Sequence, residues 1–320
     1  MDTYHQLSSH WKKKFGTRVQ KIPLDAGFHC PNRDGTLSRK GCVFCNPAGS
    51  GTGLYSSGMS LKEQYHYWRT KFLSRQPSSL FAAYLQSYSN SYGPASRINN
   101  ILRELDSLPD LRVLCIGTRP DCLDLQKISI MARFPTKETW LEMGLQSSNT
   151  ETLKRINRGH TAEDFDHACR LAHSQGLKVC AHVIAGLPGE ELEDFLQTIE
   201  FVNRLPVQGI KLHNMYVCKN TTLARWWYEG EYIPLLREEY VQWATAALSS
   251  LRADIVVHRL TGDPTGDELL APEWSRSKTT TINMIRENMQ SRGLKQGSSY
   301  QPDPVGFFAR PLSTFNTWQE

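Results

Sequence analysis

Strand-like apolar segments alternate with helical segments along the first two thirds of the chain, and this alternation limits the fold more than any other feature. Several of the apolar segments are too continuous to leave one face polar, which is typical of parallel strands that are buried on both faces. A strand followed by a helix, six times over, predicts an α/β fold, a partial (β/α)6 barrel of the TIM type. The six segments are TRVQKIPLD, SLFAAYLQS, LRVLCIG, TWLEMGLQS, LKVCAHVIAG and VQGIKLHNMY.

The pattern changes after about residue 216, and we expect three regions. Residues 1–17 predict a short amphipathic helix, and residues 18–216 predict the barrel. Residues 217–320 predict a C-terminal, α-rich extension that covers the barrel opening, with one strand-like segment, DIVVHRL.

The charge and the cysteine content exclude several classes of protein. With 37 Lys and Arg against 32 Asp and Glu, the formal net charge is +5, which permits a polyanionic substrate without requiring one. Eight cysteines in 320 residues are too few for a disulfide scaffold, and no apolar stretch follows the charges of the N-terminal segment as in a signal peptide. No apolar run reaches the ~18 residues of a membrane span. We therefore expect a cytoplasmic protein that does not enter a membrane.

Three cysteines, Cys30, Cys42 and Cys45, lie in one loop rich in glycine, proline and asparagine, directly after the first predicted strand. Thiolates are soft ligands that suit iron–sulfur clusters and zinc, so this loop predicts a metal site. A structural zinc site uses four protein ligands, whereas three thiolates on a four-iron cluster leave one iron free to bind a reactant. A redox CxxC of the thioredoxin type and a zinc site completed by His29 are the alternatives.

Polar or glycine-rich residues also follow the other predicted strands. The second strand ends in Gln86, Ser87 and Ser89, the third in GTRPDC, the fourth in GLQS, the fifth in GLPGE, and the sixth in His213 and Asn214. In parallel barrels the loops after the strands carry the active site, so we expect these residues to surround one site.

Taken together, the cysteine loop and the segments GTRPDC, LEMGLQSSNTETLKRINRGH, HVIAGLPGE and GIKLH resemble the radical S-adenosylmethionine (radical SAM) superfamily. More narrowly, the chain is similar to the YhcC-type bacterial proteins of the branch related to the catalytic subunit of elongator. The similarity covers residues 18–216 and continues into VHRLTGD and LLAPEW. The eleven residues between Cys30 and Cys42 exceed the commonest spacing of the superfamily, but the longer gap occurs in this branch.

The resemblance implies a [4Fe–4S] cluster held by Cys30, Cys42 and Cys45, with S-adenosylmethionine (SAM) bound to the fourth iron. In such enzymes the reduced cluster cleaves SAM, and the resulting 5′-deoxyadenosyl radical abstracts hydrogen from the substrate. The protein places these cofactors and excludes water. An external electron donor, flavodoxin-like or ferredoxin-like, is therefore an expected partner.

The same resemblance assigns cofactor contacts by position within the matching motifs. Gln146 and Arg158 correspond to polar residues that related enzymes place near SAM, and the backbone at Ile184 and Gly186 would lie along its adenine. Phe44 matches an aromatic residue that shields the cluster. The alternatives are that Gln146 caps the next helix and that Arg158 pairs with a nearby carboxylate.

The chain departs from the pattern of related enzymes in the first half of the barrel and on the fifth strand. Gly117 and His182 occupy positions that are often acidic, so the ribose contacts of SAM are not assigned. The second strand lacks the Gly-Gly-Glu motif that commonly holds the methionine amine, which leaves Gln86, Ser87 and Ser89 to replace it.

The motifs do not assign the residues that act on the substrate. His182, Lys211, His213 and Arg259 are candidates because they lie in strand-like segments near strand ends. A hydrogen-bonded core histidine is the alternative for these histidines and for His258.

The five cysteines outside the loop need separate treatment. Cys115, Cys169 and Cys180 lie within apolar patterns, where free cysteine behaves as a small core residue. Cys122 and Cys218 follow strand ends, so they either face the site or are buried, and burial is favoured for Cys122.

For the substrate we favour tRNA, at the side chain of the wobble uridine, because the resembling branch includes RNA-acting enzymes and the net charge is positive. A small molecule or a peptide is the first alternative, and a non-catalytic iron–sulfur sensor is the second. Trp226 and Trp227 could stack on a base, but packing of the extension is the interpretation that we favour.

Overall fold

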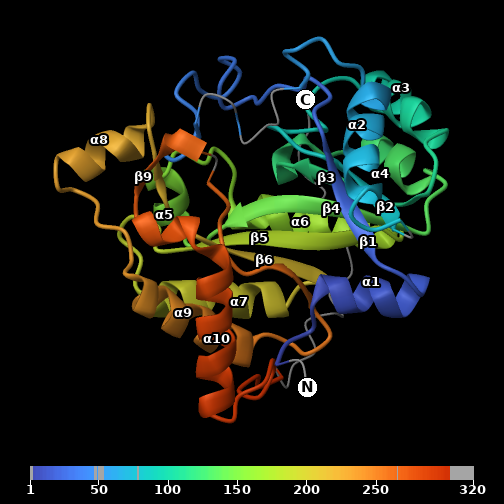
Figure 1. The fold of residues 1–320 in the computed structure, drawn as a ribbon. Helices are drawn as coiled ribbons and strands as arrows, with labels where there is room; N and C mark the ends of the chain where they lie inside the picture. Colours follow the sequence, from blue (N-terminus) through green and yellow to red (C-terminus); the bar gives the residue numbers. More distant parts are fainter. Residues whose placement is uncertain (1–2, 47–48, 50–53, 78, 265, 303–320) are drawn as a thin grey trace.

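Seven parallel strands form one sheet in the computed structural model, which describes residues 3–46, 49, 54–77, 79–264 and 266–302 (Figure 1). The strand order is β1–β2–β3–β4–β5–β6–β8, and each neighbouring pair is parallel. The predicted α/β partial barrel is confirmed, and the sheet has one strand more than the six that the sequence pattern predicts. The strands are β1 Val19–Leu24, β2 Leu80–Leu85, β3 Leu111–Thr118, β4 Glu138–Gln146, β5 Lys178–Ala185, β6 Gly209–Asn214 and β8 Val256–Arg259.

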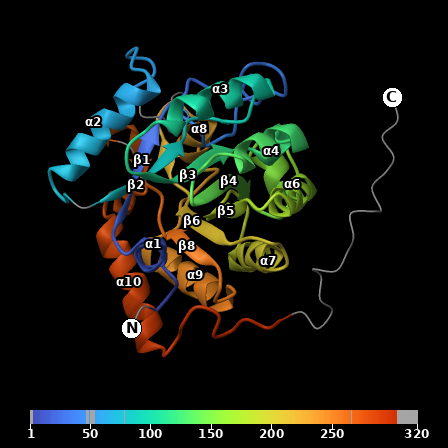
Figure 2. The ribbon, with the colours of Figure 1, turned by 90° about the vertical axis from the view of Figure 1, so that its right-hand side faces the viewer.

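Helices surround the strands, as Figure 2 shows, and their apolar faces pack on the sheet in one large core. Capping boxes at Ser60 and Thr161 begin α2 and α6, because each side chain satisfies a backbone N–H that the first helical turn leaves unpaired. The helices are α1 Leu7–Phe15, α2 Leu61–Leu73, α3 Ala95–Asp106, α4 Leu125–Ala132, α5 Thr150–Arg155, α6 Ala162–Ser174, α7 Leu192–Asn203, α8 Thr222–Tyr228, α9 Arg237–Ser250 and α10 Lys278–Ser291. Short 3-10 helices are η1 Pro120–Cys122, η2 Gly266–Glu268 and η3 Glu273–Arg276, and β7 Val217–Cys218 pairs with β9 Leu269–Ala271 in a small antiparallel sheet.

The seventh strand, β8, comes from the part of the chain that we expected to form an extension. It pairs with β6, and Lys211 is the partner of Arg259 in this register. On the other side of β8, the backbone N–H of Val257 donates to the carbonyl oxygen of His5 at 2.7 Å. The expected division at residue 216 therefore does not coincide with the edge of the sheet, and the N-terminal segment covers backbone groups that an edge strand would leave unpaired.

Helix α1 closes the end of the barrel at which the strands begin. It contacts both β1 and β8. Its Trp11, only 3% exposed, packs in a small apolar cluster with Val19 of β1 and Trp140 of β4. Because this end is filled by side chains, a ligand site has room at the opposite end of the strands.

A buried glutamate at the start of β4 connects α1 to the sheet by charge. The Glu138 carboxylate lies 2.7 Å from Lys14 Nζ, 2.9 Å from Lys178 Nζ and 3.1 Å from His10 Nε2, and it accepts a hydrogen bond from Trp140 Nε1 at 2.7 Å. Burial opposes the ionisation of this carboxyl, but the hydrogen bonds from His10, Lys14 and Lys178 outweigh burial and hold its pKa below the usual range.

The remainder of the C-terminal region packs on the cysteine loop. The N–H of Leu223 in α8 donates to the carbonyl oxygen of Val43 in that loop at 2.8 Å. Trp226 and Trp227 pack against the apolar cluster that Val43 and Leu223 share, so the packing role favoured for them is confirmed. None of the helices in the described part of the chain has both the length and the apolar character that a bilayer crossing needs.

We expect Glu138→Gln to lower the free energy of unfolding at pH 7 by on the order of 2 kcal/mol, since hydrogen bonds to charged groups contribute about that much. The pKa of Glu138 is lower in the folded than in the unfolded protein. Its contribution is therefore complete above the unfolded-state pKa of about 4.3, and it is lost as the pH falls through the folded-state value. The stabilities of wild type and variant should converge on acidification.

Urea unfolding followed by circular dichroism at several pH values measures this convergence. Glu200→Gln, at a side chain of α7 that is 67% exposed, is the matched control and should change little. Equal stability of wild type and Glu138→Gln at pH 7 would contradict the prediction.

Candidate active site

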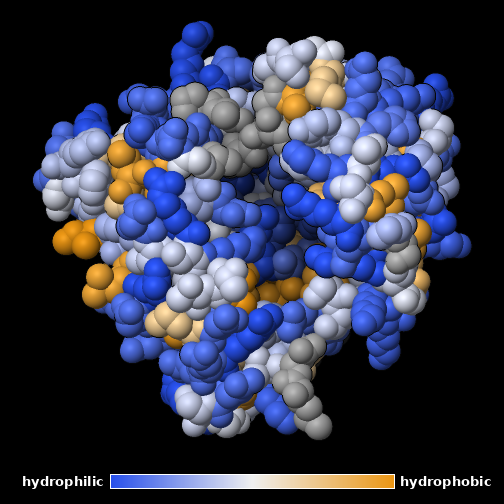
Figure 3. Space-filling model, viewed as in Figure 1, coloured by the Kyte–Doolittle hydropathy of each residue, from blue (hydrophilic) through white to orange (hydrophobic). Residues whose placement is uncertain are grey.

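A cavity of about 770 Å³ opens at the carboxyl ends of the strands, within the range of sites for small molecules and cofactors. Figure 3 shows the hollow near the centre of the molecule, with mostly hydrophilic residues around it. The predicted site residues that line the cavity are Cys30, Cys42, Phe44, Cys45, Gln86, Ser87, Gln146, Arg158, His182, Ile184, Lys211, His213 and Arg259.

Two of the residues expected near SAM do not line this cavity. The carbonyl oxygen of Gly186 accepts a hydrogen bond from Tyr232 Oη at 2.8 Å, and a side chain at Gly186 would meet Leu235. Ser89 is fully buried, with its hydroxyl 2.9 Å from Thr118 Oγ1. In the structure these two residues make the contacts described, and their predicted contacts with SAM stay predictions.

The cysteine loop is held in place by the segment that follows β4. Val43 donates its N–H to the carbonyl oxygen of Ile156 at 3.1 Å, and Asn157 Nδ2 donates to the carbonyl oxygen of Gly41 at 2.6 Å. These bonds connect residues more than a hundred positions apart in the chain. The loop after β1 and the loop after β4 are therefore one structural unit.

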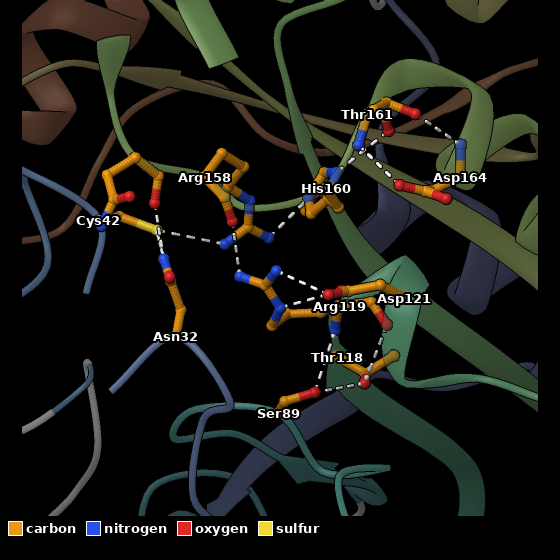
Figure 4. A network of polar contacts seen from close by, with 12 residues as sticks. Asn32, Cys42, Ser89, Thr118, Arg119, Asp121, Arg158, His160, Thr161 and Asp164 are labelled. Carbon is orange, nitrogen blue, oxygen red and sulfur yellow. Dashed lines mark hydrogen bonds and ion pairs between the residues drawn. The ribbon is translucent and has the colours of Figure 1, made fainter. Parts of the chain in front are cut away.

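Three side-chain N–H groups point at cysteine sulfurs. Cys42 Sγ accepts hydrogen bonds from Asn32 Nδ2 at 3.6 Å and from Arg158 Nη1 at 3.5 Å (Figure 4). Cys45 Sγ accepts one from Arg33 Nη1 at 3.4 Å. Donors to sulfur favour the thiolate form, which is the form that binds metal. Burial, and then the negative charge of Cys42, raises the pKa of Cys45 to about 11, although Arg33 opposes this rise. The Cys45 thiolate therefore needs a bound cationic group in addition to its hydrogen bond from Arg33.

The three thiols fit an iron–sulfur cluster by their chemistry and spacing. Within the described residues, no three histidine, cysteine or carboxylate side chains converge closely enough to hold a single metal ion. A zinc ion requires such convergence, whereas the thiolates of a four-iron cluster bind different irons. His29, the fourth ligand of the zinc alternative, is exposed and does not line the cavity. His29 therefore does not join the cysteines as a fourth zinc ligand in this structure, and the soft thiolates suit a cluster.

Arg158 is fixed in its orientation toward Cys42 by a buried network. Its Nη2 donates to the carbonyl oxygen of Gly144 at 3.0 Å, and its own carbonyl oxygen accepts from Arg119 Nη1 at 2.8 Å. His160 Nε2 lies 2.9 Å from the same Gly144 oxygen. Burial, followed by the charges of Arg158 and Arg119, lowers the pKa of His160 to about 2, so this ring is neutral. A side chain at Gly144 would collide with the Arg158 guanidinium, which explains glycine there.

The backbone is strained at two of the predicted SAM contacts. Ser87 has a φ of 93° and Gln146 a φ of 73°, in the left-handed region that non-glycine residues rarely adopt. The Ser87 hydroxyl is also buried without a hydrogen-bond partner among the described residues. Such strain and such an unpaired group are found at ligand sites, where the surrounding structure holds them in place.

One buried carboxylate in the cavity is absent from the sequence-based assignments. Glu142 of β4 is 1% exposed and forms ion pairs with Lys21 of β1 and Lys211 of β6. His182 Nε2 lies 3.4 Å and His258 Nδ1 3.6 Å from its carboxylate oxygens. Burial opposes ionisation, but the two lysines outweigh it and hold the pKa of Glu142 well below its usual range. The sequence does contain a sign of this buried carboxylate, because a glutamate stands in the middle of the apolar segment TWLEMGLQS.

The cysteines outside the loop fall into two groups. Cys115, Cys169 and Cys180 are fully buried, as expected for core residues. Cys122 is 5% exposed and does not line the cavity, whereas Cys218 of β7 is 4% exposed and does. The burial favoured for Cys122 is therefore confirmed.

Comparison with known proteins identifies the family. Residues 81–202 match the Radical SAM superfamily, and residues 207–291 match the Radical_SAM C-terminal domain. Protein YhcC of Escherichia coli (strain K12) is 34% identical over 289 residues, which are 90% of this chain and 92% of YhcC. The chain belongs to the radical SAM superfamily. The members of this superfamily bind a [4Fe–4S] cluster and SAM, so the predicted cofactors are confirmed at the level of the family.

Two further similarities relate this radical SAM protein to Elp3. The tRNA uridine(34) acetyltransferase of Methanocaldococcus jannaschii is 32% identical over 186 residues, which are 57% of this chain and 33% of that protein. The structure of Methanocaldococcus infernus Elp3 with an N-terminal deletion of residues 1–46 has a TM-score of 0.67 at 19% identity, covering 87% of this chain and 64% of that one. The second likeness shows the fold alone. The matched residues 81–202 begin after the cysteine loop, and the match names no individual residue, so the roles of the site residues stay predictions.

Arg158→Gln should make the reduction potential of the reconstituted cluster more negative, by on the order of tens of millivolts. In wild type, the positive charge of Arg158 and its N–H donor at Cys42 Sγ both stabilise the reduced cluster, which carries more negative charge. The variant lacks both. A redox titration monitored by electron paramagnetic resonance measures the change. Arg204→Gln, on the outer helix α7, is the control, and an equal potential in Arg158→Gln and wild type would contradict the assigned contact.

Proposed function

We propose that this protein is an enzyme that reductively cleaves SAM and uses the resulting radical to modify tRNA at the side chain of the wobble uridine. The observation that carries the proposal is the meeting, in one cavity, of three cysteines with residues from the ends of β2, β4, β5, β6 and β8. Superfamily membership supports the enzyme class, and the tRNA uridine(34) acetyltransferase relative supports the substrate.

The residues of this chain would act by binding, orienting and excluding water. When bound, the cluster and SAM supply the reductive cleavage of the sulfonium and a 5′-deoxyadenosyl radical. Cys30, Cys42 and Cys45 would hold the cluster. Arg158 would stabilise the negative charge on Cys42, because its guanidinium is only 8% exposed and donates to that sulfur.

The lining on either side of the cysteines suits a bound SAM. Gln146 and Ser87, which have left-handed backbones at the ends of β4 and β2, would present polar groups to it. Phe44 and Ile184 line the same cavity with apolar surface and would keep water from the reacting atoms. Polar contacts from two strands and an apolar wall therefore fix one orientation of the ligand.

Replacing Cys30, Cys42 or Cys45 by alanine should abolish both the cluster and the formation of 5′-deoxyadenosine. The measurements are iron and sulfide content after anaerobic reconstitution, and chromatography of the products after reduction with SAM present. Cys169→Ala, at a fully buried position in α6, is the control and should keep both properties. Retention of the cluster in all three variants would contradict the proposed enzyme class. A wild-type cluster that never yields 5′-deoxyadenosine would also contradict it and would favour an iron–sulfur sensor.

A strain that lacks the gene should show an altered modification at the wobble uridine when its tRNA nucleosides are profiled by mass spectrometry. Wild-type protein should restore the profile, and the Cys42→Ala variant should not. Binding of tRNA should weaken steeply as the salt concentration rises, because phosphate contacts release counterions. An unchanged profile together with active SAM cleavage would assign the enzyme to a small molecule or a peptide.

A further inference from the structure

A cluster of charged side chains from four strands lies inside the barrel. Glu142 of β4 forms ion pairs with Lys21 of β1 and Lys211 of β6. Arg259 of β8 is the register partner of Lys211 and lines the same cavity. We call these four residues the floor cluster.

The floor cluster has more positive than negative charge. Its one carboxylate is ionised, because the two lysines hold its pKa well below the usual range. The histidines around it are neutral, since burial and then the charge of Lys211 lower the pKa of His182 to about 4, and burial lowers that of His258 to about 3. One carboxylate therefore faces three cations in a site that is largely shielded from water.

Arg259 is the member of the floor cluster whose charge is not compensated. Glu142 is paired with the two lysines, whereas the described residues place no hydrogen-bond acceptor or carboxylate within bonding distance of the Arg259 guanidinium. The charge of Arg259 acts on Tyr84, His213 and Tyr216, none of which is anionic. Asp263, which also acts on Tyr216, forms its ion pair with Lys278 at 3.2 Å. A half-buried guanidinium without an anion is costly unless a ligand supplies one.

We propose that the floor cluster binds an oxyanion of the substrate, a carboxylate or a phosphate, with Arg259 as the direct contact and Lys211 as the supporting charge. The planar fork of an arginine matches two oxygens of either group. The inference rests on the proposed function, in which SAM binds at the cysteines and leaves the floor cluster of the same cavity to the substrate. The site would therefore select a substrate, or a reacting part of one, that carries negative charge.

Calorimetric titration of the anaerobically reconstituted, full-length protein tests this inference. The probes are sodium acetate and inorganic phosphate, each at constant ionic strength with chloride, and each titrated first without SAM and then with saturating SAM. Wild type should bind one of the two saturably, and the preferred probe identifies the oxyanion as carboxylate or phosphate. Arg259→Gln should weaken that binding tenfold or more, and Arg259→Lys should restore part of it, because it keeps the charge without the fork.

Arg225→Gln is the matched control, since it removes one positive charge from a side chain of α8 that is 66% exposed. It should bind the preferred probe as wild type does. Circular dichroism of all variants establishes that they are folded, and Arg259→Lys keeps the test valid if Arg259→Gln does not fold.

Each remaining outcome overturns the inference. The first is that wild type binds neither probe saturably, and the second is that wild type and Arg259→Gln bind the probe equally. The third is that SAM displaces the probe, which would assign the floor cluster to the SAM carboxylate. Release of 5′-deoxyadenosine by the same wild-type preparation is measured in parallel. If that product forms without oxyanion binding, only this inference fails, whereas saturable binding without that product leaves the floor cluster in place and removes the proposed function.

Discussion

The parallel direction of the strands is the constraint on which the rest of this structure depends. It places the carboxyl ends of all seven strands at one end of the barrel, so that loops separated by many residues meet there. Helix α1, with Trp11 and the ion pairs of Glu138, fills the other end. The chain thus has a packed end that contributes stability and an open end where the chemistry-bearing residues gather.

At the open end, the cysteine loop depends on a neighbour that is distant in sequence. Asn157 and Ile156, just after α5, hold its backbone, and Arg158 and Asn32 donate to the sulfur of Cys42. This arrangement couples the cluster ligands to the end of β4, where Gln146 adopts its strained backbone. The predicted cluster ligands and the predicted SAM contacts therefore belong to one connected structure, and we expect a change in one to affect the other.

Inside the barrel, ion pairs between charged side chains replace apolar packing around Glu142. A buried carboxylate is unfavourable unless cations compensate it, and Glu142 has ion pairs with Lys21 of β1 and Lys211 of β6. Burial keeps the surrounding histidines neutral. The charged groups inside the barrel are consequently Glu142, whose pKa the lysines hold well below its usual range, together with Lys21, Lys211 and Arg259.

Periodicity and motif order were enough to predict the first six strands, the cysteine trio and most of the cavity lining, because both are properties of contiguous residues. The seventh strand was recognised only as a strand-like segment, since pairing with β6 is a matter of register and not of pattern. Gly186 was assigned to a ligand, but in the structure its carbonyl faces Tyr232, which lies far along the chain.

Glu142 shows most clearly the difference between what the sequence predicts and what only the tertiary structure shows. Its sequence neighbourhood, TWLEMGLQS, predicts a buried strand and says nothing of the charges that would compensate a glutamate there. Those charges come from Lys21 and Lys211, 121 and 69 residues away. They converge because the inward-facing side chains of strands that are not neighbours in the sheet meet inside a barrel. The sequence by itself therefore determined the family and the fold class and predicted the cluster ligands, whereas the tertiary structure alone decided which charged groups share the interior.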